Sequence, residues 1–429
     1  MRVMIKASLA GLLLLGVASA ASAQEAVAEF RRLRSEAVAA AGADDLATAS
    51  ERLAQADAVI PNHPGLMLMR ARVAAQGGDL ADGVVQLGRY AGAGLILDPS
   101  RDAALSLLAE TPGYEAILTR LAANREPVGA DKLSVVATLP AGGLAESVAR
   151  DQARGRWLVS RVAGRTILAV NDAGVVTPFL ETAPDIGGVL GIVVDEARGR
   201  VWAVTAPLPP ATHGLETPPL TALLEIDLTS GRILARYGAP DRGADRTFGD
   251  VALGPDGGVY VADSAGGEIF WLARGADALT VLVGPGKFGS PQGMAVTPDG
   301  QALIVVDYSS GLHRVDLTGS GVVRLPAPSD ASLIGIDGLA RDGTVLYAIQ
   351  NGVNPQRVLK LAMDAGWTRI DRVEVLAANL PEIDEPTTGL VHAGGLVFVS
   401  RSQWSDFEQN GALKEGADGL AIIARLRLD

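Results

Sequence analysis

Three oxygen-bearing side chains occupy the same position in three copies of a repeated sequence unit. They are Glu146, Gln292 and Asp337. Carboxylate and carboxamide oxygens are hard donors, the ligands that Ca²⁺ and Mg²⁺ prefer. If the fold brings the three together, they could hold one such cation. The alternative is that Glu146 and Asp337 are polar residues at strand starts that bond nearby backbone amides.

The repeated unit is a β-hairpin, in which a short alternating segment meets an apolar segment across a Gly-containing turn. Three clear copies read GDVALGPDGGVYVADS (249–264), QGMAVTPDGQALIVVDYS (292–309) and DGLARDGTVLYAIQNG (337–352), and looser copies begin at 146, 190 and 388. The aligned starts are between 43 and 59 residues apart, which suits one four-stranded propeller blade of roughly 40–50 residues each. The segment 128–429 is therefore predicted to be a six-bladed β-propeller.

The last blade has only three strands at the C-terminal end of the chain. The segment KLSVVATL at 132–139 can supply the fourth. Strands from both ends of the domain would then close the ring and leave no open edge.

In such a ring the innermost strands would start at the mouth of a central channel, and the second strands would end there. Amide, phenol and indole side chains at those ends suit an oxygen-rich, partly apolar ligand. The candidates for ligand contact are Tyr308, Gln350, Asn351, Gln403 and Trp404. A long segment at 205–222, with His213 near its middle, leaves the same face and is either a lid or surface decoration.

These hairpins, together with the pair Asp337-Gly338, resemble the senescence-marker-protein, gluconolactonase and luciferin-regenerating-enzyme superfamily of six-bladed propellers. The resemblance implies one divalent cation, Ca²⁺ or Mg²⁺, held at the channel mouth by Glu146, Gln292 and Asp337. Gln292-Gly293 stands where that family usually has Asn-Gly. The resemblance also implies lactone hydrolysis, in which Asp337 or Asp250 would take a proton from the attacking water.

The third blade departs from the family. Its lactonases hold the sugar there with an Arg and an Asn, whereas this chain has Thr247 and Gly249 at those positions. Arg246 lies one residue before the first position and is a candidate for substrate binding, and Asp250 matches the Asp that ends the motif. Two functions stay open: a metal-dependent hydrolase of lactones or related esters, and a non-catalytic ligand-binding or protein-interaction scaffold.

The N-terminal part has two further segments. Residues 1–23 have the form of a signal peptide, with Arg2 and Lys6 before SLAGLLLLGVASA and a small-x-small site at 21–23. We therefore expect a periplasmic or secreted protein without a membrane span in the mature chain. Residues 24–127 show helical periodicity and resemble tetratricopeptide repeats. This helical domain would either cap the propeller or bind a protein partner.

Composition excludes several classes of site. The chain has 429 residues, no cysteine and a net charge of −12, so it lacks thiolate chemistry and the clustered basic residues that nucleic acid requires. The four histidines are too scattered for a tetrahedral zinc site. GPGKFG at 284–289 fits G-x-G-x-x-G, but a tight turn at Asp299-Gly300 follows it instead of a helix, which argues against a dinucleotide site.

Overall fold

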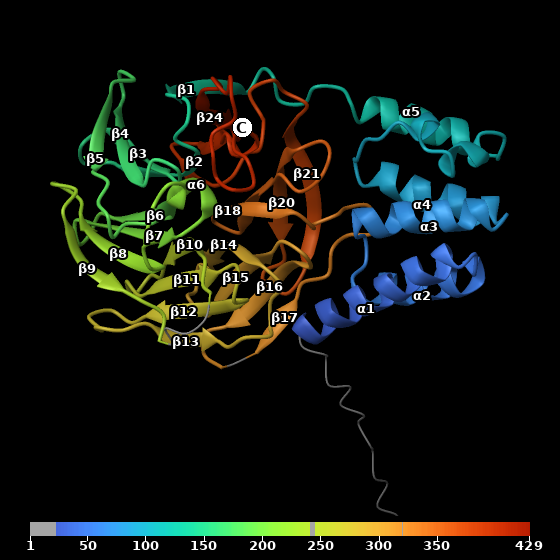
Figure 1. Ribbon diagram of the computed structural model, residues 1–429, viewed down its shortest axis with the longest axis horizontal. Coiled ribbons are helices and arrows are strands. Elements are labelled where there is room, and N and C mark those ends of the chain that lie inside the picture. Colours follow the sequence, from blue (N-terminus) through green and yellow to red (C-terminus); the bar gives the residue numbers. More distant parts are fainter. Residues whose placement is uncertain (1–22, 241–244, 320) are drawn as a thin grey trace, which may run out of the picture.

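Six four-stranded antiparallel sheets surround a central channel and make up the chain from residue 133 to residue 427 (Figure 1). The structure is a computed structural model that describes residues 23–240, 245–319 and 321–429. Together with the N-terminal helices, this architecture confirms the predicted six-bladed β-propeller preceded by an α-helical region. The predicted signal peptide lies outside the described residues up to position 22.

Each of blades one to five takes four consecutive strands. The bounds are β2 (Ala145–Asp151), β3 (Arg156–Arg161), β4 (Thr166–Asn171) and β5 (Val176–Leu180) in blade one; β6 (Gly188–Asp195), β7 (Arg200–Ala206), β8 (Ala222–Asp227) and β9 (Ile233–Tyr237) in blade two; β10 (Phe248–Leu253), β11 (Val259–Asp263), β12 (Glu268–Leu272) and β13 (Thr280–Val283) in blade three; β14 (Pro291–Val296), β15 (Ala302–Asp307), β16 (Gly311–Asp316) and β17 (Val322–Arg324) in blade four; and β18 (Ile336–Asp342), β19 (Val345–Gln350), β20 (Arg357–Met363) and β21 (Ile370–Ala378) in blade five.

Blade six closes the ring with strands from both ends of the propeller. It contains β22 (Gly389–His392), β23 (Gly395–Arg401), β24 (Ala421–Arg427) and, outermost, β1 (Leu133–Leu139). β1 pairs antiparallel with β24, from Leu133 opposite Leu426 to Leu139 opposite Ala421. The predicted closure by residues 132–139 is thereby confirmed.

The core lies between neighbouring blades. One apolar cluster joins blades three and four through Ile269, Met294 and Val305, and similar clusters fill the other interfaces. All six residues of β15 are buried. Packing on both faces of each sheet makes the ring rigid, so the starts of the innermost strands are held in fixed positions around the channel.

The helical region (residues 23–127) contains α1 (Ala23–Gly42), α2 (Leu46–Val59), α3 (Pro64–Gln76), α4 (Leu80–Gly92) and α5 (Tyr114–Ala123), with 3₁₀ turns at Pro99–Arg101 and Leu105–Leu108. The side chains of Asp45 and Asp79 cap α2 and α4 by accepting backbone amides, and they lie 34 residues apart. In both helix pairs, α1–α2 and α3–α4, the second helix therefore begins with the same type of aspartate N-cap. The resemblance to tetratricopeptide repeats beyond this stays a prediction.

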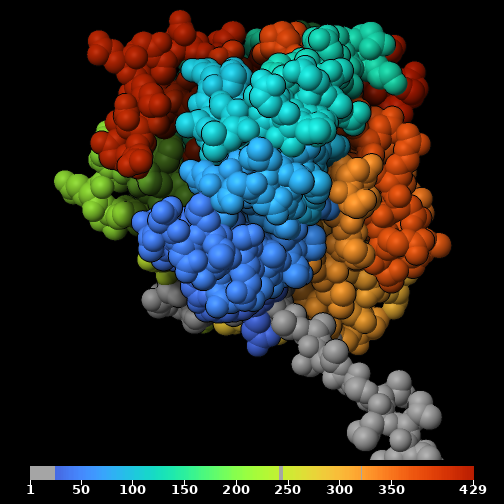
Figure 2. Space-filling view, turned by 90° about the vertical axis from the view of Figure 1, so that its right-hand side faces the viewer, coloured from blue at the N-terminus to red at the C-terminus, as the bar shows by residue number. Residues whose placement is uncertain are grey.

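The helices lie along one side of the propeller, beside blades four and five (Figure 1). Figure 2 shows this side, where the blue to cyan surface of the helical region lies next to the orange surface of the propeller. Val128 forms an antiparallel bridge with Ala378 of blade five, which ties the linker to the propeller. Among the described residues, no helix is both long and apolar enough to cross a bilayer.

Two histidines make stability depend on pH. Burial lowers the pKa of His63 and of His313 from 6.5 to about 4. The unfolded chain binds these protons first as the pH falls, so the contribution of the two histidines to the free energy of unfolding should decrease between about pH 6.5 and pH 4. The shift at the fully buried His313 corresponds to roughly 3 kcal/mol. His63, whose ring is partly exposed and stacks on Phe30, should contribute less.

Urea unfolding at pH 7 and at pH 5 would test this expectation. The His313→Gln variant should lose less stability than the wild type between the two pH values. An equal change in stability in both proteins would show that His313 does not contribute to the pH dependence.

Candidate functional site

A cavity of about 250 Å³ lies at the channel mouth, where the innermost strands begin. All six blades line it. The lining includes the six residues that the repeat alignment made equivalent, namely Glu146, Leu190, Gly249, Gln292, Asp337 and Thr388. The structure thus brings together Glu146, Gln292 and Asp337, and their role as cation ligands stays a prediction.

A backbone irregularity turns these side chains toward the channel. In blades one to five the ladder between the first two strands shifts register at or beside the aligned residue: Glu146, Leu190, Gly249, Gln292 and Asp337. A residue in such a bulge is left out of the regular pairing, and its side chain is aimed differently from its neighbours. The same local distortion, repeated around the ring, builds one cavity.

Glu146 is buried at the cavity wall. The indole Nε1 of Trp404 donates to its Oε2 at 2.9 Å, and the hydroxyl of Thr387 donates to its backbone oxygen at 2.6 Å. Loss of hydration raises the pKa of the Glu146 carboxyl well above its ordinary value, and the nearby carboxylate of Asp337 raises it further. Trp404 thus holds the carboxyl from the blade-six side.

Asp337 is held by a short hydrogen-bond chain. The side-chain amide of Asn351 donates to Oδ2 of Asp337 at 2.7 Å and to the Pro386 carbonyl at 2.9 Å. The Tyr308 hydroxyl donates to Oδ1 of Asn351 at 3.0 Å. Loss of hydration raises the pKa of Asp337 to about 6, although the Asn351 bond opposes the shift. The chain fixes which way the carboxylate faces.

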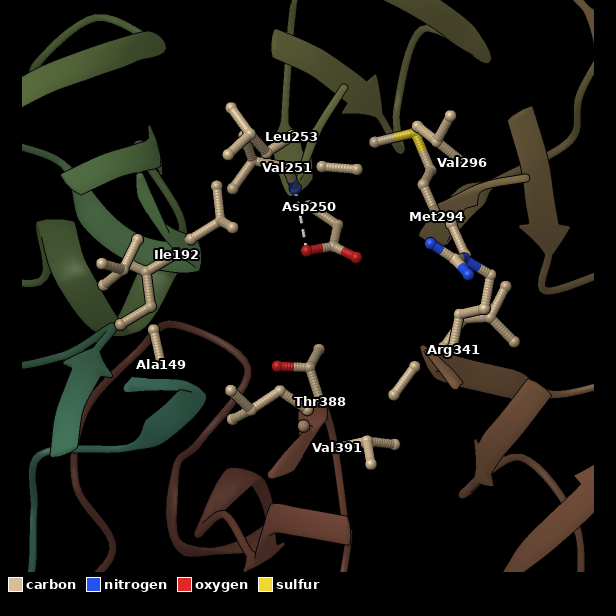
Figure 3. A pocket seen from close by; sticks show the side chains of 18 of the residues that line it. Ala149, Ile192, Asp250, Val251, Leu253, Met294, Val296, Arg341, Thr388 and Val391 are labelled. Atoms are coloured by element: carbon tan, nitrogen blue, oxygen red, sulfur yellow. Dashed lines mark hydrogen bonds between the residues drawn. The ribbon is translucent and has the colours of Figure 1, made fainter. Parts of the chain in front are cut away.

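Asp250 lies deeper in the channel, between two cavities. Its Oδ1 accepts the Val251 amide at 2.8 Å. Loss of hydration raises its pKa to about 7. Asp250 also lines a second cavity of about 440 Å³ that runs toward the other end of the channel. Figure 3 shows its carboxyl pointing into this space, among apolar side chains that include Ile192 and Met294.

Gln292 adds a carboxamide beside these carboxylates. Its Nε2 donates to the Ser290 hydroxyl at 3.1 Å, and its Oε1 accepts from the Ser264 hydroxyl at 3.3 Å. The amide oxygen therefore has a defined direction. A side chain at Gly249 would have its Cβ only 2.3 Å from the Ser264 hydroxyl. Ser264 can therefore occupy this position only because residue 249 is glycine.

Tyr308, Asn351 and Trp404 line the cavity as predicted, but Gln350 does not. The Gln350 side chain is fully buried; it donates to the carbonyls of Ser332 and Ile334 at 3.0 and 2.7 Å. Adjacent residues at a strand end face opposite ways, so the channel receives Asn351 and the blade interior receives Gln350. The prediction of a ligand contact at Gln350 needs correction.

Gln403 and Arg246 also lie outside the cavity lining. Gln403 accepts the Leu144 amide at 3.1 Å and donates to the Gly419 carbonyl. Arg246 pairs with Asp263 at 2.8 Å and with Glu268. Both side chains thus serve structural bonds behind the cavity wall, and the structure does not bring them to the predicted ligand.

Several lining residues were not predicted as site residues. Ser264 occupies the same strand end in blade three as Tyr308 and Asn351 do in blades four and five. The strand direction predicts that this end lies at the mouth, although Ser264 was not among the candidates for ligand contact. Thr247 and Leu190 also line the cavity. Their ordinary side chains give no chemical signal in the sequence.

The predicted lid segment packs against the loop of blade six. It contains α6 (Pro209–Thr212), and His213 Nδ1 lies 3.3 Å from the Asn410 carbonyl oxygen. Leu208 and Ala211 share an apolar cluster with Trp404. The two loops therefore meet beside the residue that holds Glu146, although, of the described residues in these loops, only Trp404 of the blade-six loop lines the cavity itself.

The donor set fits a hard cation. Among the described residues, no three His, Asp or Glu side chains form a metal site by themselves, so a cation would use the Gln292 amide oxygen beside the carboxylates of Glu146 and Asp337. No Lys, Arg or His is among the described residues that line this cavity. Three enclosed carboxylates without a positive neighbour would gain from neutralisation by Ca²⁺ or Mg²⁺.

The chain matches no protein-family model and no curated protein. Solved structures match over the propeller. A gluconolactonase from Xanthomonas campestris aligns at 14% identity and a TM-score of 0.49, over 69% of this chain and 89% of that one. A calcium-binding regucalcin from Agrobacterium tumefaciens aligns at 16% and 0.48, over 68% and 93%. A PQQ-bound aldose sugar dehydrogenase from Streptomyces coelicolor aligns at 16% and 0.46, over 68% and 97%. Since proteins of one fold differ in activity, function has to be argued from the cavity.

Proposed function

We propose that this chain is an exported, divalent-cation-dependent hydrolase that opens a small lactone or a related ester at the channel mouth. One observation carries the proposal: the carboxylates of Glu146, Asp250 and Asp337 share one mouth cavity with the Gln292 amide, and no cationic side chain among the residues that the structure describes lines it. Ester hydrolysis develops negative charge on oxygen, which needs a positive or hydrogen-bonding partner. In this cavity that partner would be a bound cation.

Each residue has a separate task in this proposal. Glu146, Gln292 and Asp337 would hold the cation, which when bound would polarise the ester carbonyl. With Asp337 engaged as a ligand, Asp250 is the carboxylate left to take a proton from water, and its pKa of about 7 suits a general base near neutral pH. The hydroxyl of Tyr308 lines the wall where oxygen atoms of the substrate would bind.

The first test is a calorimetric titration of the protein with Ca²⁺ and Mg²⁺, followed by a panel of lactones and esters with and without a chelator. We expect saturable binding of one cation and turnover that the chelator abolishes. Turnover that is unchanged in the presence of the chelator would contradict the cation requirement. Cation binding without turnover of any substrate would leave the binding function described below.

The Asp250→Asn variant separates catalysis from cation binding. We expect kcat to fall by about 100-fold or more because the base is lost, while Ca²⁺ affinity stays nearly unchanged. In the wild type the rate should rise with pH as the Asp250 carboxyl ionises, since only the carboxylate form accepts a proton, and the bound cation should place this inflection below the pKa of about 7 that burial alone gives. This inflection should be absent from the variant. A variant with the wild-type pH profile would exclude Asp250 as the base.

A second candidate function is a ligand-binding or scaffold protein without turnover. Thr247 and Gly249 favour it, because they replace the residues that the resembling lactonases use to hold sugar. The helical region, on which Val38 and Val85 are exposed, would then bind a protein partner. Calorimetry with the lactone panel, combined with NMR of the mixture, distinguishes the two. Binding that leaves every lactone intact favours the scaffold.

A further inference from the structure

The loop 351–356, between β19 and β20, joins the candidate site to the helical region. The strand residues on either side of it are Gln350 and Arg357, which face each other in the ladder. Arg357 Nε donates to Gln350 Oε1 at 2.6 Å. Gln350 in turn is fixed by two backbone carbonyls of the preceding loop. The base of the loop is therefore closed by a buried side-chain bond.

Arg357 also binds the end of helix α4. One of its terminal nitrogens donates to the carbonyls of Ala93 and Gly94 at 3.0 and 3.2 Å. Carbonyls at a helix C-terminus lack partners within the helix and carry the negative end of its dipole. Arg357 is only 2% exposed, and these acceptors are neutral oxygens. A guanidinium from the propeller thus caps a helix of the helical region.

The tip of the loop is held by the same region. The Ile96 amide donates to the Asn354 carbonyl at 2.9 Å. Val353 packs against the apolar cluster that contains Tyr90 and Leu95. The loop is thus bonded at its base and packed at its tip by residues of the helical region, several of which directly follow α4.

The other side of the loop forms part of the cavity. Asn351, the first loop residue, orients Asp337 through the 2.7 Å hydrogen bond and accepts from Tyr308. Gly352, the next residue, packs directly against Tyr308, because a Cβ at this position would lie 2.5 Å from the Tyr308 hydroxyl. A displacement of the loop would therefore move Asn351 away from Asp337.

We infer that the helical region is a structural part of the site: by holding the loop 351–356, it keeps Asn351 bonded to Asp337, and Arg357 is the positioning residue. This inference rests on the proposed function of the cavity for its catalytic consequence. Its structural content, the order of the loop, can be measured in the protein whether or not the protein turns over an ester.

The test compares Arg357→Met with Asn379→Gly. The first variant keeps an apolar stem and removes the bonds to Gln350, Ala93 and Gly94. The second removes two other hydrogen bonds across the same boundary, from Asn379 to the carbonyls of Asn124 and Glu126, at a residue whose positive φ suits glycine. Hydrogen exchange of the segment 350–357, followed by mass spectrometry, reports the loop. Calorimetric titration with Ca²⁺ reports the site.

In Arg357→Met we expect exchange of the segment 350–357 to become at least tenfold faster and Ca²⁺ affinity to fall at least tenfold, with both unchanged in Asn379→Gly. Arg357→Lys should restore part of the protection. If Arg357→Met does not fold, Val353→Ser tests the tip of the loop in the same way. Unchanged exchange in the folded variant, or equal effects in Asn379→Gly, would overturn the inference. A loosened loop in Arg357→Met, found together with a wild-type protein that binds no cation, would support the clamp and refute only the proposed function.

Discussion

Replacing Asp337 with Asn is expected to abolish cation binding and turnover while leaving the protein as stable as the wild type or more so. The substitution removes one charged ligand oxygen, so Ca²⁺ affinity should fall by at least 100-fold and kcat/KM with the cation by about 1000-fold. Without the cation, the variant no longer holds a charged group that loss of hydration disfavours. Its free energy of unfolding should therefore be higher by roughly 1–3 kcal/mol at pH 8.

The sign of this stability change follows from the pKa of Asp337. Its folded value, about 6, lies above the ordinary value of 3.8. The charged form thus destabilises the folded state above pH 6; this penalty decreases as the pH falls below 6 and is gone near pH 3.8. The gain from Asn should accordingly be present at pH 8 and absent at pH 4. Calcium titration and urea unfolding at both pH values measure the two effects.

Asp342→Asn is the matched control, because Asp342 ends the same strand β18 and is exposed at its far end. It should change neither cation affinity nor turnover. If Asp337→Asn bound Ca²⁺ as tightly as the wild type, Asp337 would be a structural residue that bonds Asn351, which is the alternative that the sequence left open.

The propeller and its closure could be predicted because they depend on repeated, local patterns. A hairpin with a Gly-containing turn recurs six times. The segment KLSVVATL is the strand that completes blade six, and it pairs in no other sheet of the described residues. The same register placed Glu146, Gln292 and Asp337 at one mouth. Their equivalent positions in the repeated hairpins were enough to predict this proximity, without knowledge of long-range contacts.

The direction of single side chains near the mouth could not be predicted in the same way. Gln350 and Asn351 are neighbours with similar chemistry, and which of them faces the channel depends on the strand register, which shifts opposite them between Ile336 and Gly338. Gln403 has a φ of 93°, so the backbone reverses there and presents Trp404 instead. Such choices depend on unpaired residues and loop packing, which leave no periodic signal in the sequence.

Replacing either glycine that follows a mouth residue is expected to disrupt the ring. A Cβ at Gly338 would lie 2.3 Å from the Thr387 carbonyl oxygen, and one at Gly293 would lie 2.7 Å from the Asp337 carbonyl oxygen. Both obstacles are backbone atoms of the next blade and cannot rotate away. Gly338→Ala and Gly293→Ala should each lower the free energy of unfolding by about 3 kcal/mol or more.

Gly92→Ala is the control, since no heavy atom lies within 4 Å of a Cβ at this helical position. It should be neutral or stabilise the protein by up to about 1 kcal/mol. Urea unfolding of the three variants measures these values, and a loss below about 0.5 kcal/mol at Gly338 would mean that neighbouring blades can separate without penalty.

The glycine variants also connect the fold to the site. Gly293 lets blade four approach the backbone of Asp337, and Gly338 lets blade five approach the threonines that bond the Glu146 backbone. The separation of the two carboxylates is therefore set by close backbone contacts between blades four, five, six and one. In Gly293→Ala protein that still folds, Ca²⁺ affinity should fall at least tenfold because Asp337 is displaced from Glu146. Wild-type affinity in that folded variant would show that the cation does not depend on this spacing.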